Sequence, residues 1–325
     1  MLLRNLWRAA CVFGVCHTLI AVAHAQPTYP AKPIRLVIPF PAGGASDVVA
    51  RMVGQPMSER LGQNILIDNR GGAAGNIGTE LAAKAPPDGY TLAFGNLSTH
   101  AVNAAIYKLP FSPDRDFAPI TVVAVLTNIL VVHPTLPVHS VKEIIGLAKA
   151  RPRQIDYASA GSGSPAHLAG EMFNSMAGVK LNHIPFRGGA LATNDLVAGH
   201  VAIMFNAMPA AMPHVQTARL RALAVTTAKR SLGAPEVPTI AESGLPGYDL
   251  SSWNGILAPA GTPREIITRL RDETVRALQI ADVNRRLVAI GADPMGNTPE
   301  EFAAMIRADL VRMAKLVKES GARAD

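Results

Sequence analysis

The sequence predicts an α/β protein whose two lobes are joined by two hinge strands. Short apolar strands alternate with amphipathic helical stretches along nearly the whole chain, a pattern typical of α/β folds with largely parallel sheets. Residues 118–133 form an apolar run too long for one ordinary strand, so we expect it to leave one sheet and enter another. The Pro- and Gly-rich run 233–263 is the second candidate crossing, which makes the first lobe discontinuous.

The individual elements follow from local patterns. In the first helix Val49, Val53, Met57 and Leu61 recur at four-residue spacing and form one core-facing stripe. Thr298 precedes a proline and two glutamates, which predicts the start of the last helix. Strands are expected at 34–39, 64–68, 90–95, 118–133, 154–160, 181–186, 200–206 and 220–227, and the final helical stretches at 263–290 and 298–319.

These elements divide the chain into two predicted lobes behind a leader. Residues 26–125 and 236–325 are expected to form lobe 1, and residues 126–235 the inserted lobe 2. Residues 1–25 have a basic start, an apolar run and an Ala-x-Ala site at their end, which predicts a cleaved secretory signal. The apolar run is short for a membrane span, and bulky Val15 disfavours a lipoprotein signal at Cys16. We therefore expect a periplasmic protein.

Charge and cysteine content narrow the function. The chain has 31 basic and 24 acidic residues, and because the leader carries two arginines and no acid, the remainder has a net charge of +5. The basic residues are dispersed and aromatic residues are few, which argues against a nucleic-acid partner. Both cysteines lie in the leader, so thiol nucleophiles, disulfides and thiolate metal sites are excluded from the mature chain.

The first candidate site is the loop "PFPAGGAS" between the first strand and the first helix. Gly43 and Gly44 allow close backbone approach, while Ser46 or Asp47 can cap the helix. A helix N-terminus favours an anion through its free N–H groups and its dipole. The alternative is a tight turn without a ligand. Asp47 could also contact a ligand amine or only cap its helix.

A second loop, in "YASAGSGSPAHLAGEMF" (157–173), repeats this design. Ser164 is the expected N-cap, and Gly161 and Gly163 make the backbone available to a ligand. The run also matches the loose dinucleotide fingerprint G-x-G-x-x-A, which keeps a nucleotide-binding protein or an α/β enzyme open as the alternative function. His167 in the first helical turn could face a cleft or simply pack.

Two further strand-to-helix junctions add candidates. Arg187 in "IPFRGGALATNDLVAGHV" (184–201) could grip a carboxylate with its planar fork, or be solvated. Asp195 could cap or orient the same loop, and Ser98 and Thr99 are donors at the junction 95–103. No G-x-S-x-G elbow, P-loop or HExxH motif occurs, and His133 and His139 lack a carboxylate neighbour. We expect neither an enzyme nor a cofactor or metal.

Six segments in register resemble the Bug-type periplasmic substrate-binding receptors of tripartite tricarboxylate transporters. They are residues 29–51, 69–92, 99–121, 157–173, 184–201 and 236–263, and the resemblance covers roughly residues 29–320. It implies a two-lobed Venus-flytrap fold, a small carboxylate ligand, membrane transporter subunits as partners, and a monomer. The implied ligand set is Phe40, Ala42, Gly43, Gly44, Ser46, Asp47, Ser98, Thr99, Ala160, Gly161, Gly163, Ser164, Arg187 and Asp195.

This chain departs from the family pattern at two places near the third loop. Ala202 stands where the family usually has an acid, and Leu191-Ala192 stands where a proline is usual. Both changes can alter the lower wall of the ligand cleft. The identity of the carboxylate or amino acid stays open, as does a role in sensing rather than in uptake.

Overall fold

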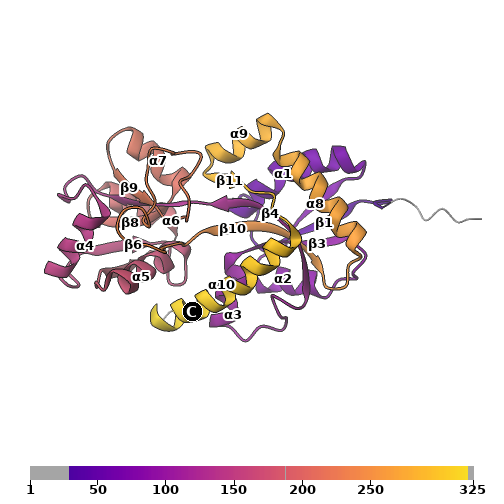
Figure 1. Ribbon diagram of the computed structural model, residues 1–325, viewed down its shortest axis with the longest axis horizontal. Helices are drawn as coiled ribbons and strands as arrows, with labels where there is room; N and C mark the ends of the chain where they lie inside the picture. The colour runs from indigo at the N-terminus through magenta and orange to yellow at the C-terminus, as the bar shows by residue number, and fades with distance from the viewer. Residues whose placement is uncertain (1–28, 187, 321–325) are drawn as a thin grey trace, which may run out of the picture.

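The computed structural model describes residues 29–186 and 188–320, and it shows two α/β lobes connected by strands (Figure 1). Each lobe is built on one mixed sheet with helices on both faces, so the predicted two-lobed α/β fold is confirmed. The predicted leader, residues 1–25, lies outside the described residues. Within the described ranges no helix is long and apolar enough to cross a membrane.

The first lobe is built on a six-stranded sheet. Parallel pairing joins β1 to β2 and β3, whereas β10 runs antiparallel between β3 and β4, so the sheet is more mixed than the sequence pattern predicted. Its order is β11-β4-β10-β3-β1-β2. The strands are β1 (Ile34–Ile38), β2 (Ile65–Asn69), β3 (Thr91–Asn96), β4 (Phe117–Leu126), β10 (Ser252–Pro259) and β11 (Ala292–Pro294).

Helices cover both faces of this sheet. One face packs against α1, α8 and α9, and the stripe predicted from Val49, Val53, Met57 and Leu61 is buried there. The other face packs against α2, the π-helix η2 and α10. The bounds are α1 (Ala45–Leu61), α2 (Asn76–Ala83), η2 (Ser98–Val102), α3 (Asn103–Ile106), α8 (Arg264–Leu278), α9 (Ala281–Ala289) and α10 (Pro299–Ser320), with the short η1 at Ala73–Gly75.

The second lobe is built on a five-stranded sheet of order β7-β6-β8-β5-β9. Parallel pairing joins β6 to β7 and β8, and β5 runs antiparallel to β8 and β9. The strands are β5 (Asn128–Val132), β6 (Asp156–Ser159), β7 (Asn182–Pro185), β8 (Ile203–Ala207) and β9 (Arg221–Val225). The helices are α4 (Val141–Ala150), α5 (Pro165–Ala177), α6 (Gly189–Val197) and α7 (Met208–Gln216).

Two segments carry the chain between the sheets. The long apolar run divides at Thr127, where β4 of the first sheet ends and β5 of the second begins, as predicted. On the return, the amide of Leu250 donates to the carbonyl of Thr226 at 2.8 Å, and β10 then enters the first sheet. Because the ends of β4 and β10 pair in register, the two crossings lie side by side (Figure 1).

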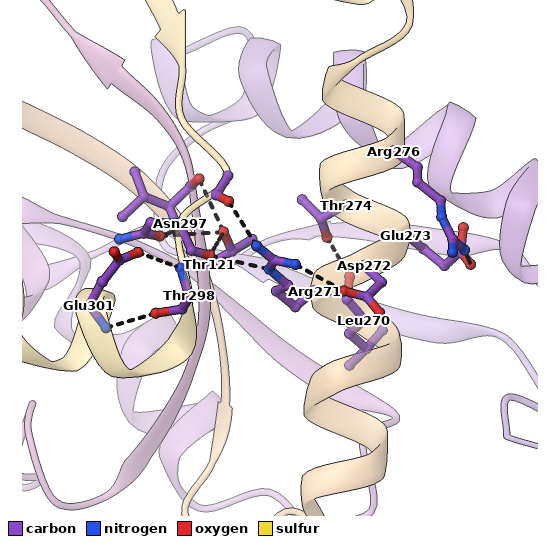
Figure 2. Close-up of polar contacts among 12 residues, drawn as sticks. Thr121, Leu270, Arg271, Asp272, Glu273, Thr274, Arg276, Asn297, Thr298 and Glu301 are labelled. Carbon is purple, nitrogen blue, oxygen red and sulfur yellow. Dashed lines mark hydrogen bonds and ion pairs between the residues drawn. The ribbon is translucent and has the colours of Figure 1, made fainter.

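The last helix, α10, is anchored at its start and contacts both lobes. Thr298 Oγ1 accepts a hydrogen bond from the amide of Glu301, whose carboxylate accepts from the amide of Thr298 (Figure 2). This reciprocal cap confirms the predicted helix start. Thr121 of β4 donates to the carbonyl oxygen of Asn297 at 2.8 Å, which fixes the helix to the sheet. Further along, α10 packs on η2 and α3 and then on α5 of the second lobe (Figure 1).

The helical stretch predicted at 263–290 is two helices. Ile280 between α8 and α9 is extended, with φ −64° and ψ 120°. The break lets Leu278 on one side and Val283 and Leu287 on the other enter the same core.

Candidate functional site

The first loop leaves the start of α1 without a side-chain cap. Its N-cap residue, Gly44, offers no side-chain acceptor, so the amides of the first turn have no side chain to accept their hydrogen bonds. Gly43 adopts φ 82°, a left-handed conformation that a residue with a side chain adopts only under strain. Ala42 and Gly43 are exposed. The loop therefore presents backbone and the positive end of a helix dipole.

Asp47 has no free hydrogen-bonding capacity for a ligand. Its carboxylate accepts from the amide of Gly43 at 2.9 Å, from Arg51 Nε at 3.0 Å and from Asn69 Nδ2 at 3.0 Å, and the residue is 3% exposed. Burial alone would raise the pKa of Asp47, but the hydrogen bonds from Arg51, Gly43 and Asn69 outweigh it and lower the pKa below 3.8. These bonds hold the first loop in shape, and a direct contact of Asp47 with a ligand stays a prediction.

A neighbouring loop, residues 69–75, supports the first loop and was missed as part of the site. Asn69 Nδ2 donates to the carbonyl of Phe40 at 3.1 Å. A methyl group on Gly75 would lie 2.9 Å from Thr99 Cγ2 and 3.3 Å from the ring of Phe40, so both residues meet at this glycine. Ala74 is left-handed at φ 55°, and Asn103 donates to its carbonyl. The glycines of this run were the available signal.

Ser98 and Thr99 differ in accessibility. Thr99 is buried, its amide donates to Asn96 Oδ1 at 3.0 Å, and its hydroxyl contacts Asn96 and His100. Ser98 is half-buried at the start of the π-helix η2. Of the two predicted donors, Ser98 is thus the more accessible.

His100 in the same π-helix is completely buried. Its ring packs edge-on against Phe117, and among the described residues its Nε2 has no hydrogen-bond partner. Burial lowers the pKa of His100 from 6.5 to about 3, so the ring is neutral at neutral pH.

Ser46 connects α1 to the hinge strand β10. Asn254 Nδ2 donates to Ser46 Oγ at 3.0 Å, and Ser46 is 6% exposed. Within the described chain Asn254 Oδ1 lacks a partner. The predicted ligand residue Ser46 therefore also anchors the first loop to the hinge, through a residue that sequence reasoning missed.

The second loop satisfies its own amides. Gly161 N donates to Ser159 Oγ at 3.1 Å, and Gly163 N donates to His167 Nδ1 at 2.9 Å. Ser164 Oγ donates to the carbonyl of Gly161 and accepts from the amide of His167, which confirms Ser164 as N-cap of α5. Both glycines have positive φ, 123° and 75°. The amides expected to meet a ligand are thus paired within the loop.

The third loop lies beside the second. The amide of Phe186 donates to the carbonyl of Ser159, and a methyl group on Gly189 would lie 3.9 Å from Cβ of Ala160. Gly188 is the N-cap of α6 and supplies no side-chain acceptor. Arg187 lies outside the described residues, so its contact with a carboxylate stays a prediction.

Asp195 lies further along α6. Its Oδ1 is 3.6 Å from Nδ1 of the exposed His200, and the pair lies near the end of the helix. The start of the helix is held instead by buried Thr193, which donates to the carbonyl of Gly189 at 2.8 Å and accepts from Asn206. Among the described residues, no contact of Asp195 with the third loop supports the loop-orienting role expected of it, whereas Thr193 makes one hydrogen bond to Gly189 and one to Asn206.

The second loop is placed at the boundary between the lobes. A methyl group on Gly163 would lie 3.7 Å from Cδ1 of Ile106 in α3 of the first lobe. Tyr248, before the hinge strand β10, donates to the carbonyl of Ala169 in α5. The second loop therefore faces α3 of the first lobe at Gly163.

A separate cavity of about 660 Å³ lies at the hinge beside α10. Val125, Trp253 and Met305 are among its lining residues, and none of the predicted ligand residues is. Its buried carboxylate, Asp309, accepts from Trp253 Nε1 at 2.9 Å and from Arg312 at 2.6 Å, and burial raises the pKa of Asp309. Arg312 is therefore already paired with a carboxylate of the cavity wall.

No group of three or more metal-binding side chains gathers anywhere in residues 29–186 and 188–320.

Comparison with known proteins identifies the family. Residues 49–322 match the family described as tripartite tricarboxylate transporter family receptor. Protein BugT of Bordetella pertussis is 37% identical over 323 residues, which cover 98% of this chain and 99% of BugT. Among solved structures, R. palustris Rpa4515 with adipate is 39% identical with TM-score 0.76, covering 91% of this chain and 99% of its own. MatC from Rhodopseudomonas palustris with bound malate is 32% identical with TM-score 0.72, and the match covers 89% of this chain and 100% of MatC. The chain therefore belongs to the receptor family of the tripartite tricarboxylate transporters.

Proposed function

We propose that this chain captures a small carboxylate between its lobes and delivers it to a tripartite tricarboxylate-type transporter. The observation that carries the proposal is a pair of helices, α1 in one lobe and α6 in the other, that both begin at a glycine without a side-chain cap. Such helix starts direct free amides and a positive dipole end toward an anion. Two of them, one in each lobe, suit a ligand with a carboxylate at each end.

Dicarboxylates are the first ligands to test. The relatives named with adipate and with malate both carry such a ligand and cover nine-tenths of this chain. The proposed contacts with the ligand are made by the start of α6 at Gly188 and by backbone and small side chains of the predicted set: Phe40, Ala42, Gly43, Gly44, Ser46, Ser98, Ala160, Gly161, Gly163 and Ser164. Asp47 and Thr99 support these contacts from behind, because both are buried and internally bonded.

The proposal includes the setting of the protein. Export through the leader at residues 1–25 would place a monomeric receptor in the periplasm, where it works without catalysis. We further propose that lobe 2 comprises residues 126–235, that the returning segment up to Leu250 packs on it, and that closure turns about the crossings at Thr127 and Ser251.

Thermal unfolding against a ligand panel tests the function. Residues 26–325 would be unfolded and refolded to remove bound ligand, then melted with adipate, malate, citrate and, for the alternative function, ATP and NAD. A ligand at about 100 times its Kd should add about 2.7 kcal/mol to the free energy of unfolding.

A matched pair of variants locates the site. Ala42→Asp adds a negative charge to the exposed first loop, and Ala304→Asp adds the same charge to an exposed position on α10. We expect Ala42→Asp to abolish the carboxylate-dependent shift and Ala304→Asp to keep it. No shift with any carboxylate, or an equal shift in both variants, would contradict the proposal.

A further inference from the structure

Two histidines lie stacked beneath the second loop. The rings of His167 in α5 and His183 in β7 are 4.0 Å apart between centroids with 14° between their planes. Tyr157 of β6 also stacks on His183, with centroids 5.0 Å apart and an angle of 27°. His167 is buried and His183 is half-buried. The second loop therefore rests on a stack of three aromatic rings contributed by three elements.

Each histidine holds one end of the loop. Gly163 N donates to His167 Nδ1 at 2.9 Å, so this nitrogen must be without a proton. His183 Nε2 shares a 2.6 Å hydrogen bond with Ser159 Oγ, which in turn accepts from the amide of Gly161. The conformation of both glycines thus depends on imidazole nitrogens rather than on backbone pairing alone.

Neutrality of the pair is a condition of this arrangement. A proton on His167 Nδ1 would turn the acceptor of the Gly163 amide into a second donor, and two imidazolium rings at 4.0 Å would repel each other. Burial lowers the pKa of His167, and burial together with His167 lowers the pKa of His183 to about 4. Both rings are therefore neutral at neutral pH.

The surroundings of the pair are mixed in charge. Glu171 raises the pKa of His167, though less than burial lowers it, and it accepts from the hydroxyl of Tyr157 at 2.6 Å. Burial and Glu171 raise the pKa of Tyr157, so this ring stays a neutral phenol. Two titratable groups face the pair, Glu171 of α5 and Tyr157 of β6. The groove beside His183 also contains Arg153 and Lys180 from loops and Glu319 from α10.

We propose that His167 and His183 are positioning residues of the ligand site, and that the second loop keeps its ligand-accepting shape only while His167 is neutral. This inference rests on the proposed function, since it assigns the loop to carboxylate binding. Acidification would release the Gly163 amide from His167, loosen the loop and weaken ligand capture. The affinity for the ligand would then depend on pH through the shape of the second loop as well as through protonation of the ligand.

Calorimetric titration with adipate or malate at about pH 7.5 and about pH 4 tests the proposal, because the lowered pKa values of both histidines keep the pair mostly neutral at milder acidity. His167→Asn places an amide oxygen near the Nδ1 position and cannot be protonated, whereas His167→Ala removes the acceptor. His183→Gln likewise keeps a polar atom for Ser159 without a titrating ring. His139→Asn, at an exposed histidine, is the control for protonation of the ligand itself.

Wild type and His139→Asn should lose about fivefold more affinity on acidification than His167→Asn, the change expected for one ordinary hydrogen bond. His167→Ala should bind about fivefold more weakly at both pH values, and His183→Gln should lose less affinity than wild type on acidification. Equal pH profiles in wild type and His167→Asn would overturn the inference.

A second readout needs no ligand. In ¹H–¹⁵N spectra of the free protein, the amide resonance of Gly163 should shift with pH in wild type and stay constant in His167→Asn. A Gly163 resonance that moves equally in both proteins would overturn the positioning role, even if every carboxylate binds. The Gly163 resonance could also shift with pH in wild type and not in His167→Asn, while the protein binds no carboxylate. That result would contradict the proposed function and still support the loop-holding role of His167.

Discussion

Replacing His100 should remove a large part of the acid sensitivity of this protein. Its ring is completely buried, and burial lowers its pKa from 6.5 to about 3. The unfolded chain therefore takes up a proton near pH 6.5, while the folded chain does not until about pH 3. Stability from this group is complete above pH 6.5 and is lost as the pH falls toward 3. By linkage, the loss by pH 5 amounts to about 2 kcal/mol.

Urea unfolding at about pH 7 and about pH 5 measures this loss. His100→Gln removes the titrating ring, and His139→Gln does the same at an exposed position. At about pH 7 His100→Gln should have a lower free energy of unfolding than wild type, because it disturbs packing against Phe117. Between the two pH values it should lose about 2 kcal/mol less of that free energy than wild type and His139→Gln do. His183 also has a lowered pKa and adds the same pH-dependent loss of stability to wild type and to both variants, so the difference between the proteins reports on His100. Equal losses in His100→Gln and His139→Gln would refute the reasoning.

Three other substitutions have defined outcomes. Asp47→Asn should weaken plain and amine-bearing dicarboxylates by the same factor in calorimetry, because the carboxylate shapes the loop; selective loss of amine-bearing ligands would show direct contact. Trp253→Phe takes the indole donor from buried Asp309 and should lower the free energy of unfolding by about 1–3 kcal/mol in urea, and an unchanged value would show that this bond contributes nothing. Gly78→Ala forces a methyl group against the backbone of Arg70 and Pro39 and should lower the melting temperature. Gly146→Ala in α4 meets open space and should raise the free energy of unfolding by about 0.5–1 kcal/mol. The reverse order of the two melting temperatures would contradict this packing.

Local patterns predicted much of the fold. The length and apolarity of residues 118–133 indicated the passage between sheets, and Thr298 indicated the start of α10, because both signals are contained in a few consecutive residues. The break at Ile280 was missed because no glycine or proline marks it. The central antiparallel place of β10 was missed because register depends on strands far away in the chain.

The candidate site was predicted through its glycines and not through its supports. Gly43 and Gly163 do occupy left-handed turns at helix starts, which their sequence context indicated. The partners that hold these turns are remote: Asn69 reaches Asp47, and His183 stacks on His167, each from another strand. A single sequence shows which residues are permissive, whereas the side chains that order a loop across the sheet become visible only when the strands are assembled.

The nested course of the chain has a consequence for how the protein is assembled during synthesis. The five-stranded sheet is built from one continuous stretch, β5 to β9, and is complete while the six-stranded sheet still lacks two strands. In that sheet β10 is the strand that joins β3 to β4, so until Pro259 has emerged β4 has no neighbour among β1, β2 and β3. The lobe whose strands begin the chain is therefore the last to close, and a chain interrupted before Ser252 would expose the edges of β3 and β4 to any partner available.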